Sequence, residues 1–485
     1  MLVEVTWPTG NSPHTTSIHI LDDDSLLNIF HLYRPFLLGE GQDVYVQMWA
    51  GGDWIGERWW YRLAHVCQRW RNLILGSASY LGLCLVCTHG TPMADMLAHS
   101  PPLPLVIDYE DVVITAEDED AIMHALAQRD RVRRIRIALP FLELQKVITA
   151  IDGEYPILEF LLLVDTTEDK NTVLTLPETL ETPHLRHLMI GGSIRIPMRS
   201  PLPGPGTVAG LVVLSLTMHH PSTYFQPTVL LQWLSLVHQL EIFMICFYFP
   251  VLNRDVERQL MRTPITTHVT LPNLRTFAFQ AVSAYSEAVL SRIAAPRLET
   301  FRIGFFKQVT FFVPQLLQFM GRTENLRFDR TEFIFYSERV YMEVNPPETE
   351  TGVFSVNVHC WHLDWQVSSV AQIFNALSQI FSTVEHLTFT HKFHSQSTEE
   401  HNEVDWAEWR KLLRSFSNVK TLRVDDGLVR ELSRCLRLED GEYPLELLPE
   451  LQELTYPGSG DANDLFTSFA DARQNAGRPL TLIKS

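Results

Sequence analysis

Cysteine and histidine side chains lie close together in the sequence at two places. Cys84, Cys87 and His89 have the spacing of half a zinc site, but a structural zinc ion needs a second pair of ligands at a compatible spacing. The surrounding stretch LGLCLVCTHG predicts a β-strand instead. The stretch HCWHLDW (residues 359–365) follows a predicted strand and indicates a loop with partly buried aromatic side chains. We therefore predict no metal centre at either place.

Clusters of acidic residues are the other groups that could carry chemistry. They lie at residues 22–24, 117–120 and 425–426, where we expect helices to start and where the helix dipole favours negative charge. The sequence has no phosphate-binding Walker loop, no Gly-x-Ser-x-Gly nucleophile turn and no His-Glu-x-x-His zinc motif. We therefore predict no catalytic residue and no cofactor, and we do not expect an enzyme.

The charge of the chain bears on its partners. Its 485 residues include 39 basic and 57 acidic side chains, which gives a formal net charge of −18. Such a chain does not suit general nucleic-acid binding, because contacts to phosphates need clustered lysines and arginines. The one basic cluster, RDRVRRIRI (residues 129–137), favours a buried strand with its arginines toward solvent, and a phosphate site is the weaker alternative.

Composition also bears on location. The most apolar window, residues 228–252, contains amide, histidine and glutamate side chains that are costly inside a bilayer, so it predicts a helix, a turn and a buried strand. Six cysteines make no disulfide framework in a chain of this length. The N-terminal stretch MLVEVTWPTG lacks the charged and apolar regions of a signal peptide. We expect no membrane contact and a cytoplasmic or nuclear location.

A repeated phrase runs along the chain with the template L-x-x-L-x-L, in which other large apolar residues can replace leucine. It is clearest as PHLRHLMI (residues 183–190), PNLRTFAF (272–279) and PRLETFRI (296–303). The first template positions, spaced by 24 to 35 residues, are 103, 132, 158, 185, 211, 240, 274, 298, 326, 353, 384, 419 and 451. The weakest assignments, Leu326 most of all, can be displaced by a few residues.

Amphipathic helices are expected between these phrases, so that each unit is a helix, a loop and a strand. The helices span residues 118–128, 144–151, 286–294, 313–320, 370–381, 406–416 and 427–436. No single unit can bury its own apolar face, and the units must therefore stack. The pattern resembles irregular leucine-rich repeats. It predicts an α/β fold in which the repeats form a solenoid with a curved parallel sheet.

In each strand the template residues point inward, and the residues between them face outward on the sheet. The outward residues of the earlier strands are apolar at Phe160, Leu162, Ile242 and Met244, and we expect loops to cover them. In the later strands they are polar, which suits reversible recognition of a protein. The predicted substrate-binding residues are His386, Thr388, Thr421, Arg423, Asp425 and Glu453, with Thr455 beside them.

Arg423 is the expected anchor of this surface, because an arginine can make forked hydrogen bonds to a carboxylate. The alternative is that all of these residues are merely solvated strand faces.

Two amphipathic helices are predicted near the N-terminus. In the first, capped by Ser25, the apolar stripe is Leu26, Leu27, Ile29, Phe30 and Tyr33. The second covers LAHVCQRWRNLIL (residues 63–75), with Leu63, Val66, Cys67, Trp70 and Leu73 on one stripe. Because the first repeat of a solenoid needs a cover for its apolar end, a capping role is one interpretation of this region.

The order of these features resembles an F-box, which has an opening leucine, a helix with Leu-Leu and Ile-Phe, and a helix with Val-Cys-x-x-Trp-x-x-Leu. The matching residues are Leu21, Leu26, Leu27, Ile29, Phe30, Val66, Cys67, Trp70 and Leu73. With SPPLPLVIDY (residues 100–109) soon after the box, the whole chain resembles the F-box-like proteins of mushroom-forming fungi. It departs from the family in its opening LDDD, where Leu-Pro is usual, and in a long Trp-rich insertion at residues 34–60.

The resemblance implies an N-terminal arm (residues 1–20), an F-box-like helical domain (21–80) and a leucine-rich-repeat-like solenoid (81–485). It implies that the nine matching residues bind the Skp-type adaptor of a cullin-RING (SCF-type) ubiquitin ligase, while the repeats hold a protein substrate. The alternative is a stand-alone repeat scaffold for protein–protein interaction in which the helical domain serves only as a cap. Co-purification of the adaptor would separate these two hypotheses.

Overall fold

A computed structural model describes residues 21–33, 58–110, 113–167, 172–197, 210–248, 265–306, 310–323, 328–346, 352–392, 406–437, 445–457 and 465–485. The chain forms two compact units. The first comprises Met1–Glu110 and Ile114–Arg134, and the second comprises Asp111–Val113 and Ile135–Ser485. Within the described ranges, no helix combines the length and the hydrophobicity needed to cross a membrane.

The described part of the first unit begins with short helices and continues into alternating strands and helices. The helices are α1 (Asp23–Tyr33), α3 (Trp59–Ala64), α4 (Gln68–Gly76) and α5 (Ala78–Leu81). They are followed by β1 (Leu85–Cys87), α6 (Met93–His99), β2 (Leu105–Glu110) and α7 (Ala116–Leu126). Strands β1 and β2 pair in parallel, with Leu85 opposite Leu105. Strand β3 (Val132–Leu139) begins in this unit and ends in the second.

Helix α1 starts earlier than predicted and has a different cap. The Oδ1 atom of Asp22, not the side chain of Ser25, accepts a backbone hydrogen bond at the helix start, at 2.7 Å from the Ser25 nitrogen. This bond lowers the pKa of Asp22. Of the predicted stripe, Leu26 and Phe30 are buried whereas Ile29 and Tyr33 are exposed, and the rings of Phe30 and Trp70 meet edge to face at 4.9 Å. Asp22 is therefore the N-cap, and the stripe packs α1 against α4.

The single helix predicted over residues 63–75 is wrong. The chain leaves α3 at Ala64, and Cys67 takes an extended conformation that begins α4, with its Sγ atom 3.5 Å from the Trp70 nitrogen. The break separates Leu63 and Val66 from the stripe of Trp70, and Val66 is 57% exposed.

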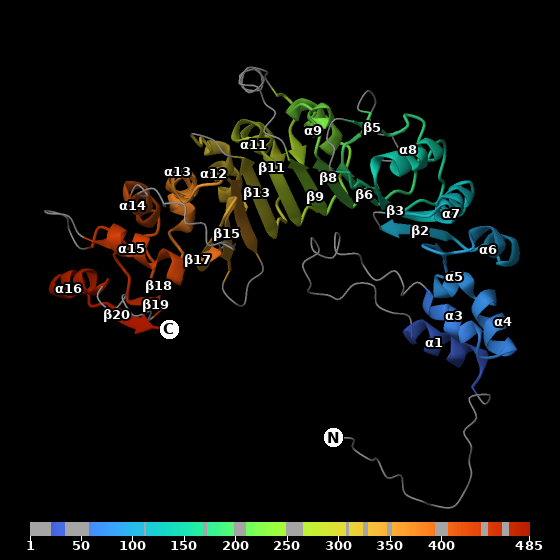
Figure 1. Ribbon diagram of the computed structural model, residues 1–485, viewed down its shortest axis with the longest axis horizontal. Coiled ribbons are helices and arrows are strands. Elements are labelled where there is room, and N and C mark those ends of the chain that lie inside the picture. The colour runs from blue at the N-terminus through green and yellow to red at the C-terminus, as the bar shows by residue number, and fades with distance from the viewer. Residues whose placement is uncertain are drawn as a thin grey trace, which may run out of the picture. The chain divides into compact units, whose positions relative to one another are not determined.

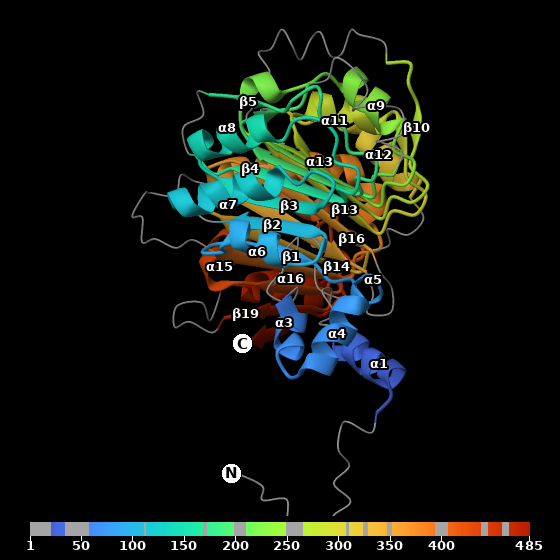
Figure 2. The same ribbon diagram turned by 90° about the vertical axis from the view of Figure 1, so that its right-hand side faces the viewer.

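The break lets the two helices make different attachments. The indole of Trp60 on α3 donates to the Cys84 carbonyl at 3.2 Å, just before β1. Helix α4 is instead tied to α1 by Arg69, which binds the Asp23 carboxylate at 2.7 Å. Figure 2 shows α3 and α4 side by side, with α1 against α4.

The second unit contains a large, mostly parallel sheet. From β4 onward the strands lie in the order β4-β6-β8-β9-β11-β13-β16-β15-β14-β17-β18-β19-β20. Their bounds are β4 Phe160–Asp165, β6 His187–Gly192, β8 Val213–Met218, β9 Ile242–Phe247, β11 Thr276–Ala281, β13 Thr300–Phe306, β14 Arg330–Tyr336, β15 Arg339–Asn345, β16 Val353–His359, β17 His386–Lys392, β18 Thr421–Val424, β19 Glu453–Tyr456 and β20 Thr481–Lys484. Two small parallel pairs, β5 (Leu174–Thr175) with β7 (Ile194–Arg195) and β10 (Val269–Thr270) with β12 (Ile293–Ala294), lie beside it.

The predicted α/β fold with helix–strand repeats is confirmed, with one interruption. Strand β15 runs antiparallel to both of its neighbours, β14 and β16, so the chain makes a meander in the middle of a parallel sheet. As a result β16, not β14, pairs with β13, with Val353 opposite Thr300. Strand β14 pairs instead with β17, with Arg330 opposite His386.

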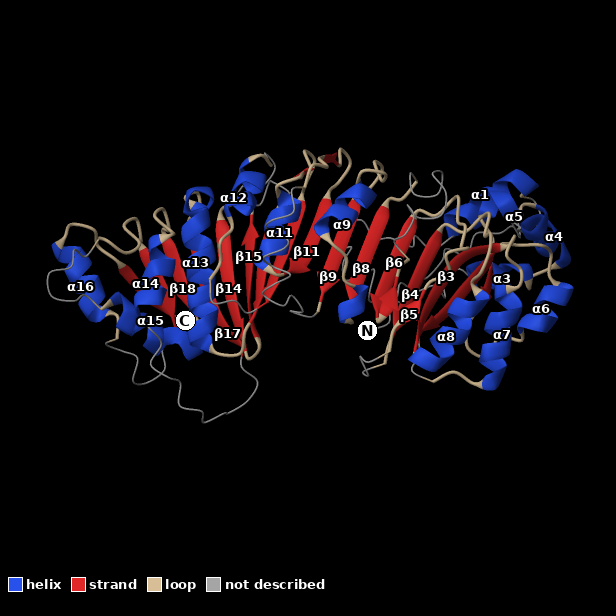
Figure 3. Cartoon of the chain, turned by 90° about the horizontal axis from the view of Figure 1, so that it is seen from above, coloured by secondary structure: helices blue, strands red, loops and turns tan. Residues whose placement is uncertain are grey.

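The helices of the second unit lie on one face of the sheet (Figures 1 and 3). They are α8 (Phe141–Ala150), α9 (Pro227–Leu234), α11 (Ser283–Leu290), α12 (Pro314–Gly321), α13 (Leu363–Phe381), α14 (Trp406–Arg414), α15 (Val429–Leu436) and α16 (Thr467–Asn475), with 3-10 turns at Pro221–Thr223 and Asp426–Leu428. Helix α13 starts at Leu363, seven residues before the predicted helix at 370–381 (370 − 363). The end of HCWHLDW (residues 359–365), which was predicted as a loop, therefore belongs to the first turn of this helix. It contacts both β15 and β16.

The core lies between the helices and the inward face of the sheet. Template positions form a ladder of phenylalanines across adjacent strands, with ring centroids of Phe243 and Phe277 at 5.3 Å and of Phe277 and Phe301 at 5.5 Å. Phe319 of α12 packs on Phe301 at 5.1 Å. Such aromatic ladders bury large apolar areas and link each repeat only to its neighbours. The predicted inward direction of the template residues is thus confirmed.

Candidate protein-binding surface

The face of the sheet opposite the helices, called the outward face here, is where the structure gathers polar side chains from different repeats. Strand register places one residue from each strand in line. Across β13, β16, β15, β14, β17, β18 and β19 this line, the central row, consists of Arg302, Ser355, Glu343, Glu332, Thr388, Arg423 and Thr455.

Most predicted substrate-binding residues lie on this face. Thr388, Arg423 and Thr455 belong to the central row. His386, Thr421 and Glu453 form the row beside it, and the His386 Nδ1 atom is 2.8 Å from the Thr421 hydroxyl. Arg423 is exposed, whereas the others are half-buried.

Asp425 has a structural task instead. Its carboxylate accepts backbone hydrogen bonds from His391 at 3.1 Å and from Asp426 at 2.8 Å, which fixes the end of β17 and starts the 3-10 turn after β18. A carboxylate has about four acceptor sites, so these two bonds leave room for a further donor. Asp425 therefore has a structural role and stays a predicted binding residue.

Two acidic residues of the central row were missed at the sequence level. Glu332 and Glu343 lie directly opposite each other on the antiparallel strands β14 and β15. The repeat template placed a unit start at Leu326, outside the described residues, whereas the register gives the equivalent position to Phe328. In TEFIFYSERVYMEV (residues 331–344) two apolar runs flank a short polar turn, which is typical of a β-hairpin, and the period of two along each strand would then have placed both glutamates on one face.

The outward residues of the earlier strands are largely covered, as expected. Leu162 and Met244 are 4% and 2% exposed, and Phe160 and Ile242 are half-buried. The structure therefore leaves the accessible polar part of the outward face on the later strands.

Exposed aromatic side chains gather at one edge of the same sheet. Tyr248, Phe312, Trp361, Trp365 and Trp406 are each between 40% and 72% exposed. All lie in connections that follow the carboxyl ends of parallel strands or in the first turn of the next helix. Aromatic residues are enriched in protein interfaces, so this edge adds to the case for a protein partner.

The cysteines considered for zinc are part of the core. Cys87 in β1 is buried, its Sγ atom lies 3.6 Å from the Tyr109 hydroxyl, and burial raises its pKa to about 11. His89 turns instead to the Asp118 carboxylate at 3.3 Å. The strand predicted for this stretch is confirmed.

One other group of potential metal ligands lies in the described residues, where Asp329, Glu385 and His386 have ligand atoms within 4.8 Å of one another. Each is engaged by a protein partner. Glu385 binds Lys420 at 2.6 Å, Asp329 lies 3.7 Å from Arg330, and the imidazole of His386 faces Thr421. These contacts account for the cluster without an ion.

The residues predicted to bind an adaptor divide into core and surface. Leu26 and Phe30 are buried, with exposures of 0% and 1%, whereas Ile29 is 45% exposed. Val66 is exposed, while Leu21, Leu27, Cys67, Trp70 and Leu73 are half-buried. Leu32 and Tyr33 of α1 and Tyr80 of α5 add further exposed apolar surface. A partner could touch the exposed members directly, while Leu26 and Phe30 would act by holding the helices together.

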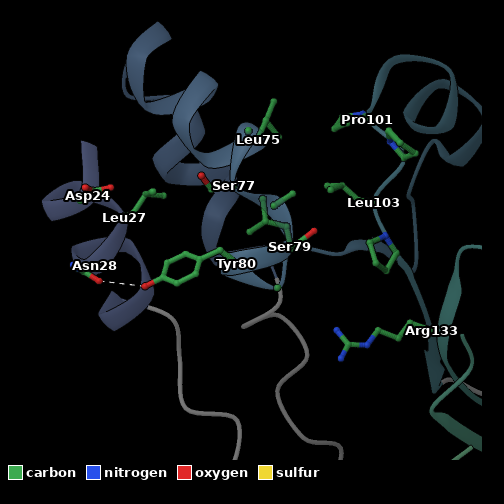
Figure 4. A pocket seen from close by; sticks show the side chains of 16 residues that line it. Asp24, Leu27, Asn28, Leu75, Ser77, Ser79, Tyr80, Pro101, Leu103 and Arg133 are labelled. Carbon is green, nitrogen blue, oxygen red and sulfur yellow. Dashed lines mark hydrogen bonds between the residues drawn. The ribbon is translucent and has the colours of Figure 1, made fainter. Parts of the chain in front are cut away.

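A hollow of about 1070 Å³ lies beside these helices within the first unit. Figure 4 shows Leu27 and Asn28 of α1 and Tyr80 of α5 on one side, with Pro101 and Leu103 across from them. The Tyr80 hydroxyl donates to the Asn28 side chain at 3.2 Å. The lining mixes polar and apolar groups, which suits a contact surface better than a small-molecule site.

Comparison with known proteins gives a likeness in structure and none in sequence families. No family model matches the chain, and no curated protein matches it. Among solved structures, it is similar to the leucine-rich repeat-containing protein LegL7 from Legionella pneumophila, with 10% identity over 80% of this chain and 98% of that one, and a TM-score of 0.27.

Proposed function

We propose that this protein is a receptor for other proteins, in which the outward face of the repeats holds a protein partner. The observation that carries the proposal is the central row, which lines up charged and hydroxyl side chains from seven strands on a face that the described helices leave open. Open, chemically mixed surfaces of this kind suit protein recognition, whereas catalysis needs convergent groups in a cleft.

We further propose that the N-terminal helices dock on a Skp-type adaptor, which would make the protein the substrate-recognition subunit of an SCF-type ubiquitin ligase in the cytoplasm or nucleus. Exposed Ile29, Leu32, Tyr33 and Val66 support this, because a small helical domain has little reason to leave large apolar side chains in water. A partner that covers about 800 Å² of this surface would suffice for a specific complex.

The stand-alone scaffold is the second candidate, and three hydrogen bonds favour it. Arg58 donates to the Val86 carbonyl of β1 at 3.3 Å and to the Thr91 hydroxyl at 3.2 Å, and Trp60 binds at Cys84. Helix α3 therefore covers the first strand, as a cap must. The two roles use different surfaces, since the cap uses α3 and the proposed docking uses Ile29 and Val66.

Isothermal titration of the full chain with a recombinant Skp-type adaptor tests the ligase proposal. The double variant Ile29→Asp, Val66→Asp should lose binding, because it puts charge into the proposed contact without touching the core. Leu142→Asp, on α8 and 66% exposed, is the matched control and should bind like the wild type. If the wild-type chain shows no heat of binding, the ligase proposal fails and the scaffold candidate stands.

The proposed partner surface has its own test. Proximity labelling in cells should give different partner sets for the wild type and for Arg423→Glu, Glu453→Arg, because the double variant exchanges the signs of two outward charges. Thermal denaturation must show that both chains are equally stable. An unchanged set of labelled proteins would remove this surface from consideration.

A further inference from the structure

The acid pair at the centre of the central row, Glu332 and Glu343, presents an electrostatic conflict. The two residues are cross-strand partners, so their Cα atoms are separated by about 5 Å. Like charges directly opposite each other destabilise an antiparallel pair. The structure thus places two carboxylates where sheet stability alone would not.

The partners of the acid pair relieve this conflict only in part. Glu343 accepts a hydrogen bond from the Tyr341 hydroxyl at 2.5 Å, and Glu332 accepts one from Thr390 at 2.9 Å. Both donors are neutral. No lysine or arginine of the described ranges forms an ion pair with either carboxylate, and Arg330, two residues before Glu332, lies with its Nε atom 3.7 Å from Asp329. The negative charge of the pair is therefore directed outward, and no lysine or arginine in the described part of the chain is ion-paired with it.

Arginines lie on both sides of the acid pair at equal distances along the row. Arg302 is separated from Glu343 by one strand, which contributes Ser355, and Arg423 is separated from Glu332 by one strand, which contributes Thr388. At about 4.8 Å between strands, each arginine lies about 12 Å from the centre of the pair. The row therefore reads positive, negative, positive across about 24 Å of sheet.

From this pattern we propose that the central row binds an extended segment of a partner protein in which a basic side chain is flanked by acidic ones. The basic side chain inserts between Glu332 and Glu343, and an acidic group beside it reaches Arg423, which is exposed. In an extended peptide, residues four positions apart lie on the same side at about 13 Å, which matches the distance from the pair to each arginine. The inference rests on the proposed protein-binding role of the outward face and specifies the chemistry of its partner.

The proposal can be tested with designed peptides and the full chain. The probe is fluorescein-labelled Glu-Ser-Gly-Ser-Arg-Ser-Gly-Ser-Glu, and fluorescence anisotropy gives its dissociation constant. The charge-reversed peptide Lys-Ser-Gly-Ser-Glu-Ser-Gly-Ser-Lys is the ligand control. The first should bind and the second should not, and binding should weaken as salt rises because the contacts are ionic.

Two variants locate the binding. Glu332→Gln, Glu343→Gln keeps the shape of the row and should weaken binding about tenfold or more, as expected for the loss of charged hydrogen bonds. The matched control is Glu154→Gln, Glu178→Gln, which removes the same charge from two exposed glutamates outside the outward face and should change nothing. Arg423→Gln should weaken binding of the probe but not of a peptide whose terminal glutamates are replaced by serine.

Three results would overturn the proposal. They are equal binding of the probe and its charge-reversed control, no binding of the probe, or binding of Ca²⁺ or Mg²⁺ alone that depends on the acid pair and blocks the probe. The last would make the pair a metal site.

Proximity labelling separates such a failure from failure of the proposed function. A labelled set that changes in Glu332→Gln, Glu343→Gln while the probe does not bind would mean that the surface is used but the partner chemistry is wrong. A set unchanged in every outward-face variant would reject the protein-binding role itself.

Discussion

Arg473 offers a sharp test of how the last repeats are held together. It lies on α16, is completely buried, and donates to three backbone carbonyls, those of Leu448 at 3.1 Å, Pro449 at 3.0 Å and Leu451 at 2.9 Å. Burial lowers the pKa of Arg473, an effect that the nearby charge of Arg478 increases. The carbonyls belong to the turn before β19, in which Leu448 has a left-handed backbone with φ of 48°.

We predict that Arg473→Ala destabilises this end of the second unit by about 3–5 kcal/mol. Each hydrogen bond from a charged donor contributes about 1.5–3 kcal/mol, so three bonds outweigh the cost of burying the guanidinium. The variant also takes the arginine donor away from the Pro449 and Leu451 carbonyls, leaves the Leu448 carbonyl with only its bond from the Leu451 amide, and removes a contact that holds Leu448 in its left-handed conformation. Arg473→Lys should recover only part of the loss, because an ammonium cannot reproduce the planar fork of donors.

Hydrogen exchange measured by mass spectrometry is the appropriate assay, because unfolding in a repeat array can be local. The amides of β19 and β20 should exchange far faster in Arg473→Ala, while those of β4 to β9 stay protected. The control is Arg478→Ala, since Arg478 makes an exposed ion pair with Glu450 at 2.9 Å and should contribute no more than about 1 kcal/mol. Equal protection of β19 in the wild type and in Arg473→Ala would refute the argument.

Three further predictions concern the rest of the chain. Burial would raise the pKa of Asp118, but hydrogen bonds from Gly90 and Thr115 outweigh this effect and lower the pKa from 3.8 to about 2. Because the folded pKa lies below the unfolded one, the Asp118 carboxylate stabilises the fold by at most about 2 kcal/mol above pH 4. This stabilisation is lost as the pH falls toward 2. The slope of unfolding free energy against pH between 2 and 4 should therefore shrink in Asp118→Asn. Gly192→Ala should lower the free energy of unfolding, measured by urea denaturation, by about 2 kcal/mol or more, since φ is +88° and a Cβ atom would lie 2.6 Å from the Asp165 carbonyl oxygen. An unchanged denaturation midpoint would contradict this. Trp70→Ala should lower the free energy of unfolding by about 3 kcal/mol, because the packing on Phe30 is lost, and it should abolish adaptor binding. Circular dichroism separates loss of folding from loss of binding. Trp70→Phe should retain most of the stability and most of the binding.

The sequence was most informative where a repeat is regular. The strand begins two residues after the first template position at 158, 185, 211, 240, 274, 298, 384, 419 and 451. The first template residue is a buried residue of the loop that leads into the strand, so the same phrase places both. The sequence was misleading where pairing with a distant strand overrides the helical pattern of a segment. The helix predicted at 286–294 ends at Leu290, since Ile293 and Ala294 pair with β10.

The candidate surface was predicted in part for the same reason. Arg423 and Thr388 follow from the template, because the period of two fixes which side chains face outward once a strand is placed. Glu332 and Glu343 do not follow from it, because the template misplaces β14 and contains no counterpart of β15. Side-chain direction is a local property, whereas which strands become neighbours depends on tertiary pairing.

The meander also bears on how the chain is made. In regular repeats a new strand finds its edge soon after synthesis, as Thr300 does opposite Thr276, 24 residues earlier (300 − 276). The free edge of β13 must wait for Val353, 53 residues later (353 − 300). At about 5–20 residues per second, the ribosome leaves this edge unpaired for about 3–10 s, roughly twice as long as its neighbours. The edge of β14 that pairs with β17 waits about as long, since His386 follows Arg330 by 56 residues (386 − 330). An open edge is a template for pairing with another chain, so β13 and β14 are the strands at which nascent copies on one polysome would most readily join and at which a chaperone would be most needed.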